Sequence, residues 1–278
     1  MDVLARDLPR ETTSVVAAAL WYPYKALPQD RVTAWAGESY AAFAELASGS
    51  HKESGVRMTS GTEAHHEQAV DPWWAAAVPD LEHVAPPPGY ADAWSFTAPV
   101  IDMPIYLDWL RARLEELGGT LTRMSLRALP RTDDVVVNCA GLGSRRLADD
   151  DGVRPVRGQV VLVKGVDLDR WWLDATGPTY VVPREHEVVV GGTDEDGDWS
   201  RTPSPATATA ILDRATHLVP ELADAEVIGH RVGLRPVRSS VRLEAEDQVV
   251  HCYGQGGAGV TLSWGCADEV TRTVGGLA

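Results

Sequence analysis

The chain has 278 residues, a formal net charge of −15 and three cysteines. This length allows one large or two ordinary domains, and we expect two. The negative charge argues against a nucleic-acid or anionic-membrane partner, because both require a clustered positive field. No apolar run is long enough to span a bilayer, and the cysteines form no C-x-x-C pair, so we expect a soluble, cytoplasmic protein. The neighbours His65 and His66 cannot face one way, and no metal site is predicted.

The first hundred residues predict few regular elements. Residues 2–7 are typical of a short strand that ends in charge. Residues 38–47 favour an amphipathic helix. Residues 49–92 are polar and rich in proline, which predicts loops with short strands.

A helix and two strands are predicted next. Pro104 suits the first turn of the helix, and Gly118-Gly119 can end it. Residues 121–124 favour a strand. Residues 134–140 are an apolar run, as expected for a parallel strand covered on both faces. The Gly141-Leu142-Gly143 turn after it faces a ligand or is a structural turn.

The middle of the chain changes character. Three short strands, at 159–163, 179–183 and 187–192, predict an antiparallel sheet that belongs to a second domain. Ser204 as N-cap and Pro205 after it predict the start of a helix.

The C-terminal region has glycines between a strand, residues 248–251, and a helix, residues 260–274. Gly254, Gly256 and Gly259 form the pattern G-x-G-x-x-G. Such a turn lets the backbone approach a ligand, and a helix N-terminus favours an electron-rich group. The second strand and acidic residue of a dinucleotide fingerprint do not follow, so we expect this loop to close a site built mainly elsewhere. The alternative is a tight turn without a ligand.

Two side chains are candidates for a site. Arg235 stands between Leu234 and Pro236, where a guanidinium needs a partner and offers a planar fork to a carboxylate. The alternative is a structural arginine paired with an internal Asp or Glu. Tyr180 lies in a predicted strand, and its alternative role is core packing with a satisfied hydroxyl.

Blocks along nearly the whole chain carry a resemblance. They are Thr12-Thr-Ser14, Leu20-Trp-Tyr-Pro-Tyr24, Asn138-Cys-Ala-Gly141, Arg157-Gly-Gln159, Tyr180-Val-Val-Pro183, Gly191-Gly192, Gly233-Leu-Arg-Pro-Val-Arg238, Arg242-Leu-Glu244 and His251-Cys-Tyr-Gly-Gln-Gly-Gly-Ala-Gly259. In order and rough spacing these blocks resemble the FAD-dependent D-amino-acid oxidase family. The resemblance implies a mixed α/β fold, with an incomplete Rossmann-like FAD-binding domain and an inserted antiparallel-sheet substrate domain. The implied FAD-binding parts are residues 1–24, 121–165 and 230–278, and the substrate parts are residues 25–120 and 166–229.

The resemblance also implies site residues. Tyr22, Tyr180, Arg235 and Gly257 would bind the substrate: Arg235 and Tyr180 its carboxylate, and the Gly257 carbonyl its amine. Arg235, Tyr180 and Gly257 would act in catalysis by orientation, without an acid or base side chain. The implied FAD contacts are Arg6 and Asp7 at the adenosine ribose; Thr12, Thr13, Ser14, Ala18, Ala19 and Leu20 at the flavin; Met124, Ala140 and Gly141 toward the nucleotide; and Gly256, Gly257, Ala258, Gly259, Val260 and Thr261 at the flavin pyrimidine end.

The implied reaction is oxidative deamination of D-amino acids, with FAD as hydride acceptor and dioxygen as the final acceptor. The products would be a 2-oxo acid, ammonia and hydrogen peroxide. The implied partners are a small D-amino acid and dioxygen, and a homodimer is possible. The alternatives are a D-aspartate or glycine/sarcosine-type amine oxidase, or a non-catalytic fragment without stable FAD.

Two departures from the family pattern stand out. The family opens with a strand, a G-x-G-x-x-G turn and a helix, whereas this sequence begins at what resembles the second strand. We therefore expect a misassigned start or a fragment, with poor solubility or weak FAD binding until roughly 30–40 upstream residues are added. The family also often has a tyrosine on its active-site lid, where residues 166–179 have Trp171-Trp172 and no tyrosine.

Overall fold

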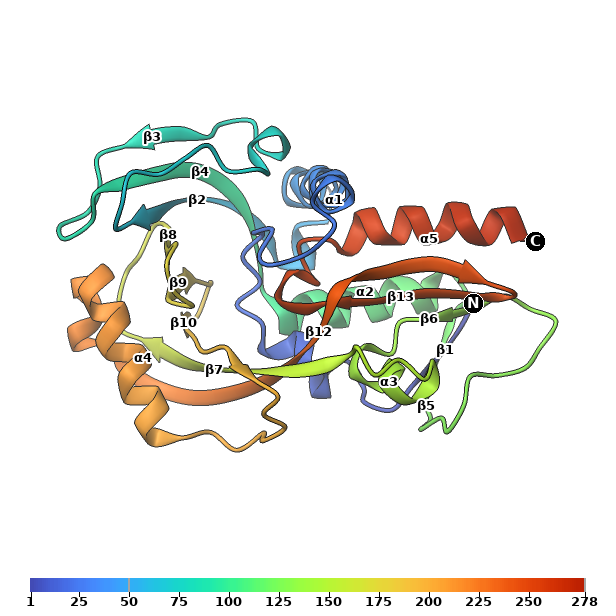
Figure 1. The fold of residues 1–278 in the computed structure, drawn as a ribbon. Coiled ribbons are helices and arrows are strands. Elements are labelled where there is room, and N and C mark those ends of the chain that lie inside the picture. Colours follow the sequence, from blue (N-terminus) through green and yellow to red (C-terminus); the bar gives the residue numbers. More distant parts are fainter. Residues whose placement is uncertain (50, 278) are drawn as a thin grey trace.

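The computed structural model describes residues 1–49 and 51–277, which form one large curved sheet, one small sheet and the helices around them (Figure 1). The helices are α1 (Gln29–Ser48), α2 (Met103–Glu116), α3 (Ser144–Leu147), α4 (Pro205–Leu218) and α5 (Ser263–Leu277). The strands are β1 (Asp2–Ala5), β2 (Val56–His65), β3 (Glu82–Val84), β4 (Asp92–Ile101), β5 (Thr120–Arg123), β6 (Val136–Asn138), β7 (Arg154–Lys164), β8 (Trp171–Asp174), β9 (Tyr180–Pro183), β10 (Val188–Gly191), β11 (Glu195–Asp196), β12 (Glu226–Glu246) and β13 (Val249–Gln255). The predicted mixed α/β class is confirmed.

The large sheet has eleven strands in the order β3-β4-β2-β8-β9-β10-β7-β12-β13-β6, and β11 pairs with β7. The predicted antiparallel strands are confirmed as β7, β9 and β10, which pair antiparallel in that region. In Figure 1 the sheet curves from β3 through β8 and β9 to β7. The long strand β12 pairs with β7 and then with β13, so one sheet includes strands of both expected domains. The division into two domains stays a prediction.

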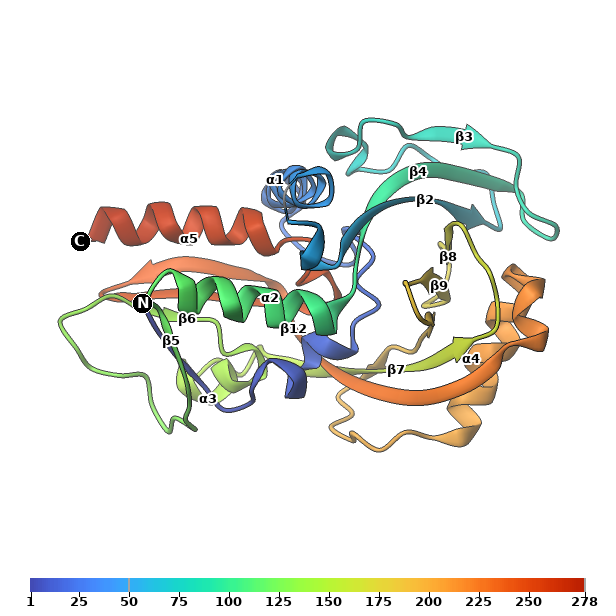
Figure 2. The same cartoon turned by 180° about the vertical axis from the view of Figure 1, so that it is seen from behind.

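The large sheet buries both of its faces in the region of β7. Val160 and Leu162 lie in one core with residues of α1 and α5, whereas Val161 and Val163 lie in a second core with residues of α4. This alternation follows from the two-residue period of a strand. Figure 2 shows α4 on the outer side of the curved strands. Its predicted N-cap is confirmed: the Ser204 hydroxyl accepts a hydrogen bond from the Thr207 amide at 3.3 Å.

The small sheet contains β1 and β5, which pair in parallel from Asp2 opposite Thr120 to Ala5 opposite Arg123. Neither strand buries a side chain fully. Strand β6 pairs in parallel with β13 and ends the large sheet. The parallel strand predicted within residues 134–140 is therefore confirmed as β6, but its expected coverage on both faces is wrong, because β6 is short and at an edge, and Val137 is 41% exposed.

Three predicted boundaries differ from the structure. Helix α1 begins at Gln29, directly after Pro28, nine residues before the predicted start, and contains Gly37 without a break. Residues 49–92, predicted to be loops with short strands, contain the ten-residue strand β2. Helix α5 begins at Ser263 and not at Val260, because residues 256–258 first form a 3-10 turn. The predicted helix after Pro104 is confirmed as α2. The predicted strands at residues 2–7 and 121–124 are confirmed as β1 and β5.

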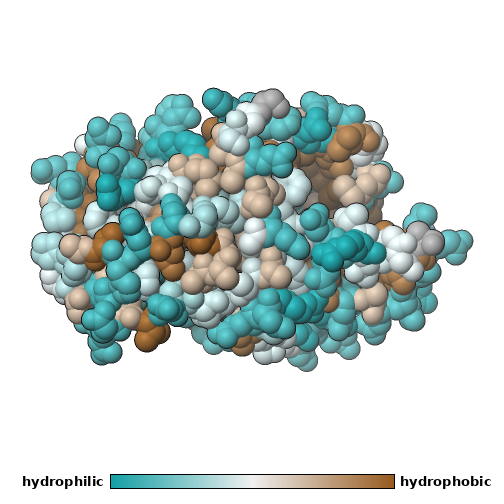
Figure 3. Space-filling model, turned by 90° about the horizontal axis from the view of Figure 1, so that it is seen from above, coloured by the Kyte–Doolittle hydropathy of each residue, from teal (hydrophilic) through white to brown (hydrophobic). Residues whose placement is uncertain are grey.

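The surface is largely polar. On the face shown in Figure 3, hydrophilic residues surround smaller hydrophobic patches. Within residues 1–49 and 51–277, the helices are too short or too polar to cross a membrane. The same residues contain no group of three or more His, Cys, Asp or Glu side chains that is suited to a metal ion.

Candidate active site

Tyr180 and Arg235 each lie over a glycine of the neighbouring strand. The Tyr180 ring lies against Gly191 of β10, where an added Cβ would be 1.9 Å from the tyrosine Cζ. The Arg235 guanidinium lies against Gly158 of β7, where an added Cβ would be 2.5 Å from Nη2. Any larger residue at Gly158 or Gly191 would therefore displace a candidate site side chain.

The two side chains lie on the same face of the large sheet. Tyr180 pairs with Gly191, Gly191 with Val160 of β7, and Val160 with Arg231 of β12. Residues that pair across strands point to the same face of the sheet. Arg235 lies four residues after Arg231 in β12, which is two periods of a strand, so both point to that face. We call this surface the Tyr180–Arg235 face. Burial raises the pKa of Tyr180, and the positive charge of Arg235 opposes part of that rise.

Arg235 is paired with an internal carboxylate. Its Nη1 donates hydrogen bonds to Asp194 Oδ1 at 2.7 Å and to the Thr193 carbonyl at 2.8 Å. Asp194 Oδ2 also accepts from the Tyr24 hydroxyl at 2.5 Å and from Lys25 Nζ at 3.0 Å. Burial alone would raise the pKa of Asp194, but these hydrogen bonds and the charge of Arg235 hold it below its usual range. The internal ion pair that the sequence left open is present, and a role of Arg235 in substrate binding stays a prediction.

The glycine loop at residues 256–261 lies beside the same group. An added Cβ at Gly257 would be 3.1 Å from Cδ1 of Tyr24 and 3.6 Å from Cδ of Arg235. Thr261 Oγ1 is 3.0 Å from both the amide nitrogen and the carbonyl oxygen of Tyr22, so it can accept from the first and donate to the second. The structure therefore brings Tyr180, Arg235 and Gly257 into one region, and the backbone of Tyr22 is bonded to the glycine loop beside them. Their role in substrate binding stays a prediction.

The residues expected to contact the nucleotide lie elsewhere, at the carboxyl ends of parallel strands. Arg6 follows β1, Met124 follows β5 and Ala140 lies two residues after β6. Gly256, expected at the flavin, follows β13, the parallel neighbour of β6. Ligands of open parallel sheets commonly bind at this edge. Arg6, Met124 and Ala140 are exposed, Met124 by 45%, and Arg6 forms an ion pair with Asp7 at 2.5 Å.

The remaining predicted contacts connect these two regions. Thr12 ends a 3-10 turn, and Thr13 and Ser14 begin the next one, which packs on β12 through Gly233. Ala18 and Ala19 are buried. Gly141 lies in the turn after β6, and Ala258, Gly259 and Val260 lie in the turn after β13. Leu20 forms an isolated bridge with Val100 of β4.

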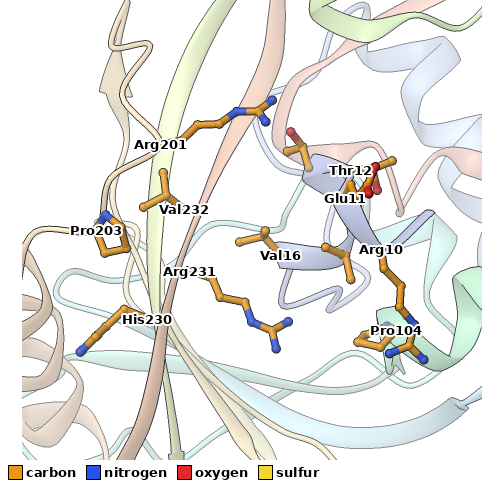
Figure 4. A pocket seen from close by; sticks show the side chains of 12 residues that line it. Arg10, Glu11, Thr12, Val16, Pro104, Arg201, Pro203, His230, Arg231 and Val232 are labelled. Carbon is orange, nitrogen blue, oxygen red and sulfur yellow. The ribbon is translucent and has the colours of Figure 1, made fainter. Parts of the chain in front are cut away.

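A cavity of about 410 Å³ lies beside Thr12 and Thr13 (Figure 4). Its lining includes Arg10, Arg201 and Arg231, and one carboxylate, Glu11, which is ion-paired with Arg123. Arg10 forms an ion pair with Asp108 at 2.5 Å on the surface. Among residues 1–49 and 51–277, no carboxylate oxygen lies within 4.0 Å of the side-chain nitrogens of Arg201 or Arg231. The cavity therefore offers positive charge that suits an anionic group.

Three residues near the site were not predicted to be functional. Asp194 lies shortly after the Gly191-Gly192 pair, and a carboxylate at such a place does not by itself indicate a functional role. Tyr24 was part of a block that carried the resemblance, without an assigned role. Glu63 lies in the strand that was not predicted, and the Tyr22 hydroxyl donates to its Oε1 at 2.6 Å.

Comparison with known proteins decides the family. A family model described as FAD dependent oxidoreductase matches residues 2–273. The chain belongs to this family. It is 46% identical to a D-amino-acid oxidase of Rubrobacter xylanophilus, over 98% of this chain and 88% of that protein. It is 43% identical to a D-amino-acid oxidase of Streptomyces coelicolor, over 96% of this chain and 87% of that protein. The crystal structure of glycine oxidase from Geobacillus kaustophilus shares the fold, with a TM-score of 0.84 and 17% identity, covering 100% of this chain and 88% of that chain.

As an FAD-dependent oxidoreductase, the protein uses FAD as its cofactor, and the predicted resemblance is confirmed. The residues present fit such a group. FAD has an anionic pyrophosphate, and two arginines of the cavity lining, Arg201 and Arg231, have no carboxylate oxygen within 4.0 Å among residues 1–49 and 51–277. Gly254 and Gly256 have positive φ angles of 88° and 57°, so the turn before α5 can approach a ligand with backbone alone.

Proposed function

We propose that this FAD-dependent oxidoreductase catalyses the oxidative deamination of D-amino acids with dioxygen, forming a 2-oxo acid, ammonia and hydrogen peroxide. The observation that carries this proposal is the position of Tyr180 and Arg235 over Gly191 and Gly158, on one face and beside the Gly257 loop. A hydroxyl and a guanidinium on the same face can both donate hydrogen bonds to a small carboxylate. The D-amino-acid oxidases among its relatives support the choice of substrate.

Each side chain has a proposed task. Arg235 and the Tyr180 hydroxyl bind the substrate carboxylate, and the Gly257 carbonyl accepts a hydrogen bond from the amine. Tyr22 lines the site next to them. Bound FAD supplies the hydride acceptor for the substrate Cα–H bond, and dioxygen takes up the electrons. The protein contributes orientation, which can lower a barrier by several kcal/mol without an acid or base side chain.

The ion pair between Asp194 and Arg235 limits which substrates Arg235 can bind. Its carboxylate shares the Arg235 guanidinium, and a substrate carboxylate would have to share that group or displace Asp194. Lys25, the other cation at this position, is also paired with Asp194. A second carboxylate on the substrate would therefore find no unpaired cation at this position, which disfavours D-aspartate as the preferred substrate.

We also propose the cofactor contacts that the resemblance implied. Arg6 and Asp7 would contact the adenosine ribose, Thr12 to Ser14 and Ala18 to Leu20 the flavin, and Met124, Ala140 and Gly141 the nucleotide. Gly256 to Thr261 would contact the flavin pyrimidine end. The arginine-lined cavity beside Thr12 and Thr13 supports an anionic cofactor group in this region. A cytoplasmic location and a homodimer are further proposals; the three cysteines, all free thiols, agree with a reducing compartment.

A substrate panel tests the function. Peroxide release is measured with D-Ala, D-Met, D-Phe, D-Asp, glycine and sarcosine, and with the L-forms of the chiral substrates. We expect turnover of the neutral D-amino acids above that of D-Asp, glycine and sarcosine. Turnover of L-amino acids without turnover of D-amino acids would contradict the proposal.

The flavin absorbance of the purified protein tests the alternative of a fragment without stable FAD. Stoichiometric bound flavin together with peroxide release would exclude that alternative. Protein that is colourless and stays colourless after incubation with FAD would support it.

A further inference from the structure

Glu63 is a buried carboxyl group with an unused acceptor. It lies in β2 and is 3% exposed. Its Oε1 accepts the hydrogen bond from the Tyr22 hydroxyl at 2.6 Å. Its Oε2 is buried and has no hydrogen-bond partner among residues 1–49 and 51–277. A buried acceptor without a partner is unfavourable and calls for an explanation.

The surroundings of Glu63 contain no strong cation. Within the described part of the chain, the only basic nitrogen within 4.0 Å is Nε2 of His65, which is 3.6 Å from Oε1. Burial lowers the pKa of His65, so its neutral form is favoured. Burial also raises the pKa of Glu63 to about 7, and the hydrogen bond from Tyr22 opposes that rise. An ionised Glu63 therefore lacks a counter-charge from the protein near neutral pH.

Glu63 lies on the Tyr180–Arg235 face. It pairs with Leu173 of β8, and Leu173 pairs with Tyr180 of β9. Paired residues point to the same side of a sheet, so the three side chains form one row. Since neighbouring strands are about 4.8 Å apart, the backbones of Glu63 and Tyr180 are about 10 Å apart.

The row begins at Tyr180 of the proposed carboxylate site and passes one apolar side chain before it reaches Glu63. Leu173 lies in the middle of it and belongs to the main core. Tyr22, whose backbone binds Thr261 of the glycine loop, closes the row beside Glu63 and packs edge-on against Trp74 at 5.4 Å. A side chain with an apolar stem and a cationic end matches this order of groups, because the stem would contact Leu173 and the cation would reach Glu63.

We propose that Glu63 is a specificity-determining residue that binds the cationic side chain of a D-amino acid such as D-lysine or D-arginine. This inference rests on the proposed function, since it needs the substrate carboxylate at Arg235 and Tyr180. Oε2 accepts the hydrogen bond from the side-chain cation, while Oε1 keeps its bond from Tyr22. The protein then provides both ends of the substrate with a partner of opposite charge.

The test compares D-lysine with D-norleucine, which has the same carbon chain and no terminal amine. The readout is the ratio of their kcat/KM values in the FAD-loaded enzyme. We expect the ratio to exceed one in the native protein and to fall at least about tenfold in Glu63→Gln, mainly through the KM of D-lysine. Glu63→Gln retains the volume and the acceptor for Tyr22 and removes only the charge.

The matched control is Glu82→Gln, the same change on the exposed edge strand β3 of the same sheet. It should leave the ratio unchanged. Parallel loss of both activities in Glu63→Gln, or a ratio that does not change, would overturn the role of Glu63 while leaving the proposed function in place. No oxidation of either D-amino acid by the native protein, although it holds FAD, would instead overturn the proposed function.

If Glu63→Gln does not fold, Glu63→Asp keeps the charge on a shorter side chain. We expect its D-lysine to D-norleucine ratio of kcat/KM to lie between those of the native and Gln forms. The corresponding ratio of D-arginine to D-norleucine should fall less, because D-arginine has the longer side chain. A Glu63→Asp ratio equal to or above the native ratio would contradict the proposal.

Discussion

The Tyr180–Arg235 face and the β1–β5 sheet are held by different kinds of contact. On the first, side chains pack on glycines, and Arg235, Asp194, Tyr24 and Lys25 form one hydrogen-bonded group. The second has backbone pairing and exposed polar contacts, such as Arg123 with Glu11 at 2.7 Å. Exposed ion pairs contribute at most about 1 kcal/mol, whereas buried packing contributes several. The region proposed to bind substrate is therefore preorganised by the protein, and the region proposed to bind the nucleotide is not.

The strongest test of this comparison is to fill the glycine surface. Gly191→Val should reduce kcat/KM at least about a hundredfold, because its side chain would occupy the space of the Tyr180 ring. Gly177→Val is the control, since an added Cβ at Gly177 meets no heavy atom within 4 Å. D-amino acid oxidation and thermal unfolding of both variants decide the outcome. Equal effects of the two substitutions would show that Gly191 is not a support for Tyr180.

The second test removes the proposed carboxylate partner. Arg235→Leu should keep the flavin absorbance and raise KM about a hundredfold, because a buried charged hydrogen bond contributes about 3 kcal/mol. Asp194→Asn should have the opposite and smaller effect, a KM lowered a few-fold, since it removes the negative charge that competes with the substrate carboxylate for Arg235. Loss of flavin and fold in Arg235→Leu would favour a purely structural arginine.

The third test uses the pH dependence of stability. The pKa of Glu63 rises from its ordinary value of 4.5 to about 7 in the folded protein, so the folded state binds more protons than the unfolded state between these values. Relative to Glu63→Gln, the free energy of unfolding of the native protein should therefore decrease as the pH rises from 4.5 to 7, by at most about 3 kcal/mol. Glu63→Gln should remove this decrease and be the more stable form above pH 7.

Tyr22 and His65, the titratable groups next to Glu63, are present in both proteins, so their own contributions to the pH dependence cancel when the native protein is compared with Glu63→Gln. Burial and the nearby Glu63 raise the pKa of Tyr22 well above 10, and burial lowers that of His65. Urea unfolding at pH 5 and pH 8 measures the effect. A native protein whose stability relative to Glu63→Gln is the same at both pH values would show that Glu63 has an ordinary pKa.

The smallest expected effect compares the two sheets directly. Val182→Ala, in the fully buried part of β9, should destabilise the protein by about 2 kcal/mol. Val3→Ala, in the half-buried strand β1, should destabilise it by less than about 1 kcal/mol. Urea unfolding measures both. A larger effect at Val3 would mean that the small sheet is as important for stability as the large one.

Local signals were enough for several elements. Ser204 and Pro205 predicted the start of α4, because an N-cap hydroxyl and a proline in the first turn act within a few residues. Pro104 and Gly118-Gly119 predicted α2 in the same way. Strand β2 was not predicted, since its polar residues do not alternate with apolar ones. Its place in the sheet depends on Gly61, where the Trp171 ring fills the space that a Cβ would need.

The sequence by itself determined the fold class, the family and the candidate residues Tyr180, Arg235 and Gly257, because motifs and short-range signals are read along the chain. Only the tertiary structure decided what surrounds them. Asp194 is 41 residues from Arg235 and Glu63 is 41 residues from Tyr22, so neither contact has a sequence signal. Strand register brings Glu63, Leu173 and Tyr180 into one row, and register depends on pairing between distant segments rather than on any one of them.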